Sequence, residues 1–255
     1  MEITEHITAV GREAKLLARA AEHGGLDADV PSCPGWDMRE LLRHLGMIHL
    51  WAAGHLTERR TDSFGAELAD LEGAWPDLGL FWPEDEQLIG WYLETNANLV
   101  DVLESAAIDV DAWTFLAAPS PRAMWARRQA HETAIHRFDA ENAAGIASTF
   151  DSEFASDGID EIVAAFAPRK DEFPVASTKA MLIHATDTDD RWHITLAPDG
   201  ITTERGDGPA DVSLAGSSQA LYLAMWNRND DQQVTIAGDR DVLDLWHGNV
   251  RVRWS

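Results

Sequence analysis

Glu132 and His136 are four residues apart in a stretch with the pattern of a helix, residues 121–142. Side chains at this spacing lie one turn apart on the same face, so a carboxylate and an imidazole there can share one ion. His44 lies among leucines in another amphipathic stretch and is expected to face the protein interior. Inward-facing His and Glu side chains from different helices are how helical bundles build metal sites. These three residues therefore predict a metal site.

Two imidazoles and one carboxylate suit zinc best, with nickel, iron or manganese as alternatives. Three protein ligands leave one coordination position for water or substrate, which is the arrangement of a catalytic site. The spacing of Glu132 and His136 also fits a surface salt bridge, because such pairs are common on exposed helix faces. His49 and His55 follow His44 on the same predicted helix, and either is an alternative ligand in its place.

Other reactive side chains favour structural roles. His131-Glu132 begins like the HExxH zinc-peptidase motif, but its second histidine would fall at Ile135, so peptidase chemistry is disfavoured. Cys33 is the only cysteine, and its proline-flanked turn favours packing over nucleophilic catalysis. One cysteine also excludes an internal disulfide and a cysteine-ligated zinc cluster. The nearby tryptophans are expected to be packing groups, one of which could floor a pocket beside the metal: Trp36, Trp51 and Trp125.

Four amphipathic stretches must position these residues. Apolar residues recur every three or four positions in residues 3–21, 37–55, 83–106 and 121–142. Gly24-Gly25 ends the first stretch, and Asp37 with Glu40 forms a plausible capping box at the start of the second. Residues 59–82 carry Gly, Pro and acids without a clean period and are expected to be a long connection. This pattern predicts a four-helix bundle.

The pattern changes after Gly145. One more helix is expected at residues 151–167, and a domain boundary after it gives domains 1–170 and 171–255. Short alternating runs separated by turn residues then predict an antiparallel sheet in a small α+β domain. The strands are expected at residues 180–186, 191–196, 201–204, 211–214, 233–237 and 250–254, and the helices at residues 217–226 and 241–246.

Charge and composition limit the partners. The 255-residue chain has 44 acidic residues against 20 Lys and Arg, a formal net charge of −24, which repels phosphate backbones and anionic lipid surfaces. Nucleic acid and membrane are therefore not expected as partners. The N-terminus lacks the features of a signal peptide, and no window approaches the roughly 18 apolar residues of a membrane span. We expect a cytoplasmic protein, and a monomer because no self-association patch is evident.

Two pairs of segments carry a resemblance to a known family. The first pair is Val30-Pro31-Ser32-Cys33-Pro34-Gly35-Trp36-Asp37 with Leu41-Leu42-Arg43-His44-Leu45-Gly46, and the second is Arg127-Arg128-Gln129-Ala130-His131-Glu132 with His136-Arg137-Phe138-Asp139-Ala140-Glu141. Weaker matches at residues 157–161, 226–228 and 237–239 extend it over nearly the whole chain. On these residues the sequence resembles the mycothiol-dependent maleylpyruvate isomerase family, which belongs to the wider DinB-like metal-binding bundles.

The resemblance implies a two-domain fold and a set of site residues. The N-terminal DinB-like bundle would bind zinc through His44, Glu132 and His136, and a small sterol-carrier-like α+β domain would follow. Mycothiol would be the thiol cosubstrate, and Arg228 of the second domain would be the functional arginine of the family. Either Arg228 or Arg137 could hold a substrate carboxylate, because an arginine fork suits that geometry. Asp139 is expected to orient a ligand or cap the helix.

The implied chemistry is thiol-dependent isomerisation or thiol transfer on a small electrophilic substrate such as an unsaturated acid. The metal lowers the pKa of the thiol, and the thiolate adds to an electrophilic carbon. Addition to a cis double bond permits rotation, and elimination then returns the trans product. In a transfer reaction the adduct is released.

Two other classes of function stay open. A thiol-free metalloenzyme could perform hydrolysis or cyclisation with Asp37, Asp139 or His49 as general base. A non-catalytic regulatory protein could keep the metal for stability, in which case a fourth protein ligand such as His49 is expected and metal removal should melt the bundle.

Overall fold

The computed structural model describes residues 1–62, 82–228 and 231–252. The chain forms two compact units that divide between Ser148 and Thr149. This division falls before the helix expected at residues 151–167, whereas the sequence placed the domain boundary after residue 170. The helix goes with the second unit because it is bonded to the sheet there: Thr203 Oγ1 donates to the carbonyl of Val163 at 2.5 Å. Of the long connection expected at residues 59–82, residues 63–81 lie outside the described part.

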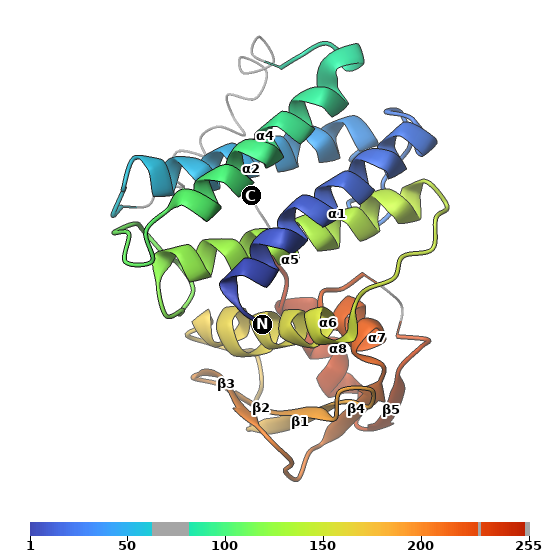
Figure 1. Cartoon of the computed structure of the whole chain (residues 1–255). Helices are drawn as coiled ribbons and strands as arrows, with labels where there is room; N and C mark the ends of the chain where they lie inside the picture. The colour runs from blue at the N-terminus through green and yellow to red at the C-terminus, as the bar shows by residue number, and fades with distance from the viewer. Residues whose placement is uncertain (63–81, 229–230, 253–255) are drawn as a thin grey trace. The chain divides into compact units, whose positions relative to one another are not determined.

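The first unit is a four-helix bundle, as predicted. Its helices are α1 (Ile3–Gly24), α2 (Met38–Thr57), α4 (Asp85–Ser105) and α5 (Pro121–Ala143). Helix α1 lies beside α5, and α2 lies beside α4 (Figure 1). None of the helices in the described ranges is long and apolar enough to cross a membrane.

Local signals fix where these helices begin and end. The capping box predicted at the start of α2 is confirmed: Asp37 accepts from the backbone N–H of Glu40 at 3.0 Å, and Glu40 accepts from that of Asp37 at 2.7 Å. At the start of α5, Ser120 accepts from the N–H of Ala123 and Pro121 takes the first turn. These caps fix the residues at which α2 and α5 begin. The helical repeat then determines which side chains of each helix face the interior.

Leucines on either side of His44 bury α2 in the bundle core. Leu41 and Leu45 are fully buried, together with Leu17 of α1 and Leu88 of α4. Burial of each such side chain contributes about 2 kcal/mol. Gly46 permits the close approach of α2 and α4, because a Cβ there would lie 2.2 Å from the ring of Trp91. This packing prevents α2 from rotating and holds His44 toward α5.

The second unit is α+β, as predicted. It contains α6 (Ser152–Asp160), a π-helix (Glu161–Phe166), a 3₁₀ turn (Ala167–Arg169), β1 (Lys179–Ala185), β2 (Asp190–Ala197), β3 (Gly200–Arg205), β4 (Val212–Gly216), α7 (Ser218–Met225), β5 (Thr235–Gly238) and α8 (Arg240–Asn249). The five strands have the order β3-β2-β1-β4-β5. Helices α6, α7 and α8 lie on one face of this sheet (Figure 1). Trp192 of β2 is fully buried, and its indole N–H donates to Asp160 of α6 at 3.0 Å.

The sheet differs from the expected one in two places. It is mostly antiparallel, but β1 and β4 pair in parallel, with Ile183 opposite Leu214. The strand expected at residues 250–254 does not form over residues 250–252, and its remainder lies outside the described part. Val250 instead closes α8, because its N–H donates to Trp246 and its carbonyl accepts from Asn227. Both backbone groups are therefore taken by helix-end contacts.

Candidate metal centre

Three buried side chains converge between α2 and α5. One possible ligand atom from each of His44, Glu132 and His136 lies within 4.8 Å of the others. Glu132 Oε1 is 3.3 Å from His44 Nε2 and 3.4 Å from His136 Nε2. The residues are 6%, 3% and 7% exposed. The three side chains singled out from the sequence are thus brought together, and a surface ion pair is excluded by their burial.

The protonation states of two of the three groups, His44 and Glu132, are those of metal ligands. Burial lowers the pKa of His44, so its imidazole is neutral and has a free lone pair. Burial alone would raise the pKa of Glu132, but hydrogen bonds with His136 and His44 and the charge of Arg128 hold it well below its usual value. Burial is likewise outweighed at His136, where hydrogen bonds with Asp139, Cys33 and Glu132 raise the pKa well above normal. A metal ion would take the place of that proton.

Charged side chains hydrogen-bond to two of the three candidate ligands, His136 and Glu132. Asp139 is fully buried and lies 2.8 Å from His136 Nδ1, so Nδ1–H donates to it and Nε2 turns toward Glu132. Arg128 is also fully buried, and its Nη2 donates to Glu132 Oε2 at 2.9 Å. Asp139 therefore has the position expected of a residue that orients a ligand.

Two residues of the turn before α2, Ser32 and Cys33, contact the carboxylate of Asp139. Ser32 Oγ donates to Asp139 Oδ1 at 2.5 Å, and the half-buried Cys33 Sγ lies 3.5 Å from Asp139 Oδ2. Cys33, His136 and Asp139 form a second possible ligand group, which shares His136 with the first. The two groups use opposite nitrogens of one imidazole. The first group consists of three buried side chains, whereas Cys33 of the second group is only half-buried.

Trp36 forms one wall of this site. Its ring lies 4.9 Å from that of His44 and stacks on that of His136 at 6.4 Å, measured between centroids. Of the three tryptophans expected to be packing groups, Trp36 thus lies against the ligands. Trp51 and Trp125 pack together instead, with centroids 4.8 Å apart.

The two alternative histidines of α2 have other contacts. His49 Nε2 lies 3.1 Å from Thr133 Oγ1, and its ring stacks on Tyr92 at 5.6 Å. His55 stacks on Trp125 at 5.1 Å. Neither belongs to a possible ligand group within the described ranges.

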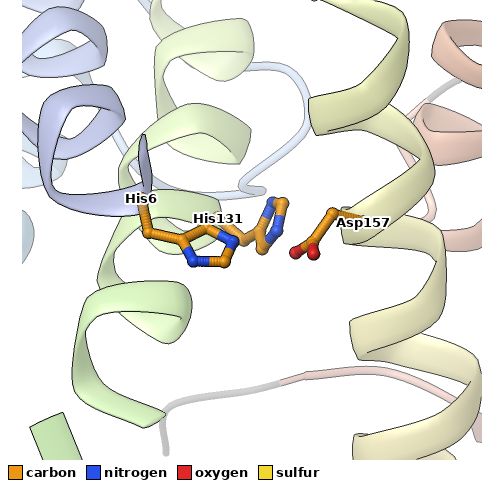
Figure 2. Close-up of side chains that lie close together, drawn as sticks. All are labelled: His6, His131 and Asp157. Atoms are coloured by element: carbon orange, nitrogen blue, oxygen red, sulfur yellow. The ribbon is translucent and has the colours of Figure 1, made fainter. Parts of the chain in front are cut away.

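His131 turns away from the ligands although it precedes Glu132. It is fully buried and packs against His6 of α1, with ring centroids 6.1 Å apart and an interplanar angle of 67° (Figure 2). Adjacent helix residues differ in direction by about 100°, which explains why only Glu132 faces His44. The incomplete HExxH match therefore has no structural counterpart.

Asp37, a candidate general base, and Arg137, a candidate carboxylate-binding residue, both form ion pairs with other side chains. Asp37 caps α2 and also binds Arg39 at 2.8 Å, which leaves it little freedom to act as a general base. Arg137 is 3% exposed, with Nε 2.8 Å from Glu13 and Nη1 3.6 Å from Glu141. Two carboxylates thus already engage Arg137.

Arg228 lies in the second unit, directly after α7. Asn227 before it and Asp231 after it have φ values of 57° and 61°, a left-handed conformation uncommon outside glycine. His247 of α8 bonds both of these residues, at 2.8 Å to Asn227 Oδ1 and 3.2 Å to Asp231 Oδ2. Asn227 and Asp231, which flank Arg228 in the sequence, are therefore both bonded to α8 through His247.

The sequence does not predict two residues that support the candidate ligands: Arg128 contacts Glu132 directly, and Ser32 contacts Asp139, which holds His136. Arg128 was recognised only as part of a motif, although its position four residues before Glu132 is the signal for an i,i+4 ion pair. Ser32 was assigned to an entry turn. Its contact with Asp139 joins residues 107 positions apart, which no local pattern reveals.

Comparisons with known proteins agree with this fold. Residues 7–141 match the family model of the mycothiol maleylpyruvate isomerase N-terminal domain, and residues 153–245 match that of the MDMPI C-terminal domain. A crystal structure of mycothiol-dependent maleylpyruvate isomerase is similar with a TM-score of 0.65 and 15% identity, over 93% of each chain. A histidine-to-alanine mutant of that isomerase gives the same TM-score with 14% identity, again over 93% of each chain. None of the curated proteins matches significantly. The two family matches show that this chain belongs to the mycothiol maleylpyruvate isomerase family.

Proposed function

We propose that this protein is a metal-dependent, thiol-dependent isomerase that acts on a small unsaturated acid, with zinc as the metal and mycothiol as the thiol. The observation that carries the proposal is the convergence of His44, Glu132 and His136 within 4.8 Å in the bundle interior. Within the part of the chain that the structure describes, this group has three members, and a three-ligand site leaves a position open. Membership of the isomerase family supports the class of reaction.

The chain's own residues prepare this site. Glu132 is anionic and His44 is neutral, as ligands must be. Asp139 fixes the tautomer of His136 so that Nε2 faces the other ligands. A divalent metal held there would bind the thiol and lower its pKa, so that a thiolate is available near neutral pH. Trp36 covers the imidazoles and limits access of water to them.

The reaction then takes place on the substrate carbon chain. The thiolate sulfur forms a bond to one carbon of the cis double bond, and the π electron pair of that bond moves onto the conjugated carbonyl group as an enolate, so the former double bond becomes single and rotates. Return of this electron pair breaks the same C–S bond, releases the thiolate and restores the double bond in the trans form, so no oxidant or reductant is needed. We propose that Arg228 holds a carboxylate of the substrate, since a guanidinium fork matches that group.

Metal analysis with a thiol titration tests the proposal. We expect about one zinc per chain in the wild-type protein and loss of the metal in His136→Ala. The cobalt-substituted protein should develop a thiolate-to-cobalt absorption band when mycothiol is added. Cys33→Ser is the matched control: it removes the nearby thiol and leaves the three ligands, so both metal and band should persist. Loss of metal in Cys33→Ser would instead favour the group formed by Cys33, His136 and Asp139.

The other outcomes distinguish the remaining functions. Bound metal without a thiolate band would favour a thiol-free metalloenzyme. Loss of the folded bundle on metal removal, without any thiol binding, would favour a structural metal. No metal in the wild-type protein would refute the proposal.

A further inference from the structure

Arg128 is a buried cation that forms an ion pair with Glu132, a candidate metal ligand. It lies one turn before Glu132 on α5 and is fully buried. A guanidinium is not placed in a protein interior without a partner, because its desolvation costs several kcal/mol. Arg128 Nη2 donates to Glu132 Oε2 at 2.9 Å, a charge-assisted hydrogen bond between two groups that water barely reaches.

This contact separates the roles of the two carboxylate oxygens. Oε2 of Glu132 is bound by Arg128, whereas Oε1 lies 3.3 Å from His44 Nε2 and 3.4 Å from His136 Nε2. Only Oε1 therefore points to the place where the three ligands meet. A carboxylate can bind a metal through one oxygen or both, so the surroundings of Glu132 determine which of the two modes it adopts.

We propose that Arg128 is a positioning residue that holds Glu132 to one metal bond and so keeps a coordination position open for the thiol; this inference rests on the proposed function. Two imidazoles and one carboxylate oxygen use three positions of a tetrahedral ion. If Oε2 were released, it could bind beside Oε1, which would raise the coordination number from four to five and crowd the position of the thiol. Arg128 also balances the negative charge of Glu132, so more of the metal's positive charge remains to attract a thiolate.

The test replaces Arg128 by Met, which has a similar length but no donor. In cobalt-loaded Arg128→Met, we expect one cobalt per chain and a visible spectrum shifted from four-coordinate toward five-coordinate. The affinity for N-acetylcysteine, followed by the thiolate-to-cobalt band, should be at least about tenfold weaker. A merely structural role would not change the coordination number. Unchanged spectrum and thiol affinity at full cobalt occupancy would overturn the proposal.

Arg137→Met is the matched control. Arg137 is also a buried arginine of α5, but it forms ion pairs with Glu13 and Glu141. Its loss should leave the cobalt spectrum and the thiol affinity as in the wild type. Equal changes in both variants would mean that the effect comes from damage to the bundle, and would contradict a specific role for Arg128.

A second measurement needs no variant. X-ray absorption fine structure of the zinc-loaded wild-type protein should show carboxylate binding through one oxygen, and the short metal-to-carbon distance of a two-oxygen carboxylate would overturn the inference. This result is independent of thiol chemistry. Zinc bound through one carboxylate oxygen, without a thiolate band in cobalt-loaded protein, would therefore refute the thiol-dependent function and leave the role of Arg128 at Glu132 standing.

Discussion

His49 should make the stability of the bundle sensitive to acid. Its side chain is fully buried, bonded to Thr133 and stacked on Tyr92. Burial lowers the pKa of His49 from 6.5 to about 3, while the charge of Glu132 acts to raise it and that of His44 to lower it. Between these two values the unfolded chain binds a proton that the folded protein does not. Acid therefore favours unfolding in this range.

The size of the effect follows from the difference in pKa. The contribution of His49 is fully present above about pH 6.5 and is lost as the pH falls toward 3. At pH 5 the unfolded histidine is about 1.5 pH units below its pKa, and each unit corresponds to about 1.4 kcal/mol. The free energy of unfolding should therefore fall by about 2 kcal/mol between pH 7.5 and pH 5 because of this residue.

Urea unfolding of chelator-treated protein at the two pH values measures this contribution. His49→Gln keeps a hydrogen-bonding group near Thr133 but cannot take up the proton, so its pH dependence should be smaller than that of the wild type by about 2 kcal/mol. His23→Gln, which changes an exposed histidine of α1, should behave as the wild type. Equal pH dependence in wild type and His49→Gln would refute the reasoning.

Three further substitutions test the support of His136 by Asp139, the cap of α2 and the backbone of β5. Asp139→Asn should weaken metal binding by about 10- to 100-fold, because a neutral amide stabilises Nδ1–H of His136 less than the carboxylate does; competition with a chromophoric chelator measures this, and unchanged affinity would contradict the role of Asp139. Asp37→Ala should lower the free energy of unfolding by about 1 kcal/mol through loss of the α2 cap, with metal content unchanged. Gly238→Ala should lower the thermal stability by more than about 1 kcal/mol, because φ is 102° and the added Cβ would lie 2.2 Å from the carbonyl oxygen of Asp211; a variant as stable as the wild type would show that β5 can shift.

Local patterns were enough to predict the helices of the first unit. A capping box and a Gly-Gly end depend on residues close in sequence, and the structure confirms both of them. The i,i+4 spacing likewise placed Glu132 and His136 on one face. The sequence left the choice among His44, His49 and His55 open, because it depends on how α2 is rotated in the bundle. That rotation comes from packing such as the contact of Gly46 with Trp91.

Non-local pairings could not be read in this way. Alternation along a strand indicates which residues are buried but not which strand is its neighbour, so the parallel pairing of β1 and β4 was missed. The helix expected at residues 151–167 continues beyond Asp160 as a π-helix, a change that residue propensity does not signal. Ser32 was missed for the same reason as the strand pairing, since its contact with Asp139 joins distant parts of the chain.

The charges around the candidate ligands suit one anionic ligand. Glu132 and Asp139 contribute two negative charges, and Arg128 contributes one positive charge at 2.9 Å from Glu132. With neutral imidazoles, a divalent ion would leave this buried group with a single excess positive charge, which one thiolate neutralises. A carboxylate ligand in addition to the thiolate would make the buried group negative in a chain whose net charge is already −24. Charge thus favours a single anionic ligand beside the three, and with a thiolate there the substrate carboxylate would be bound elsewhere, as proposed for Arg228.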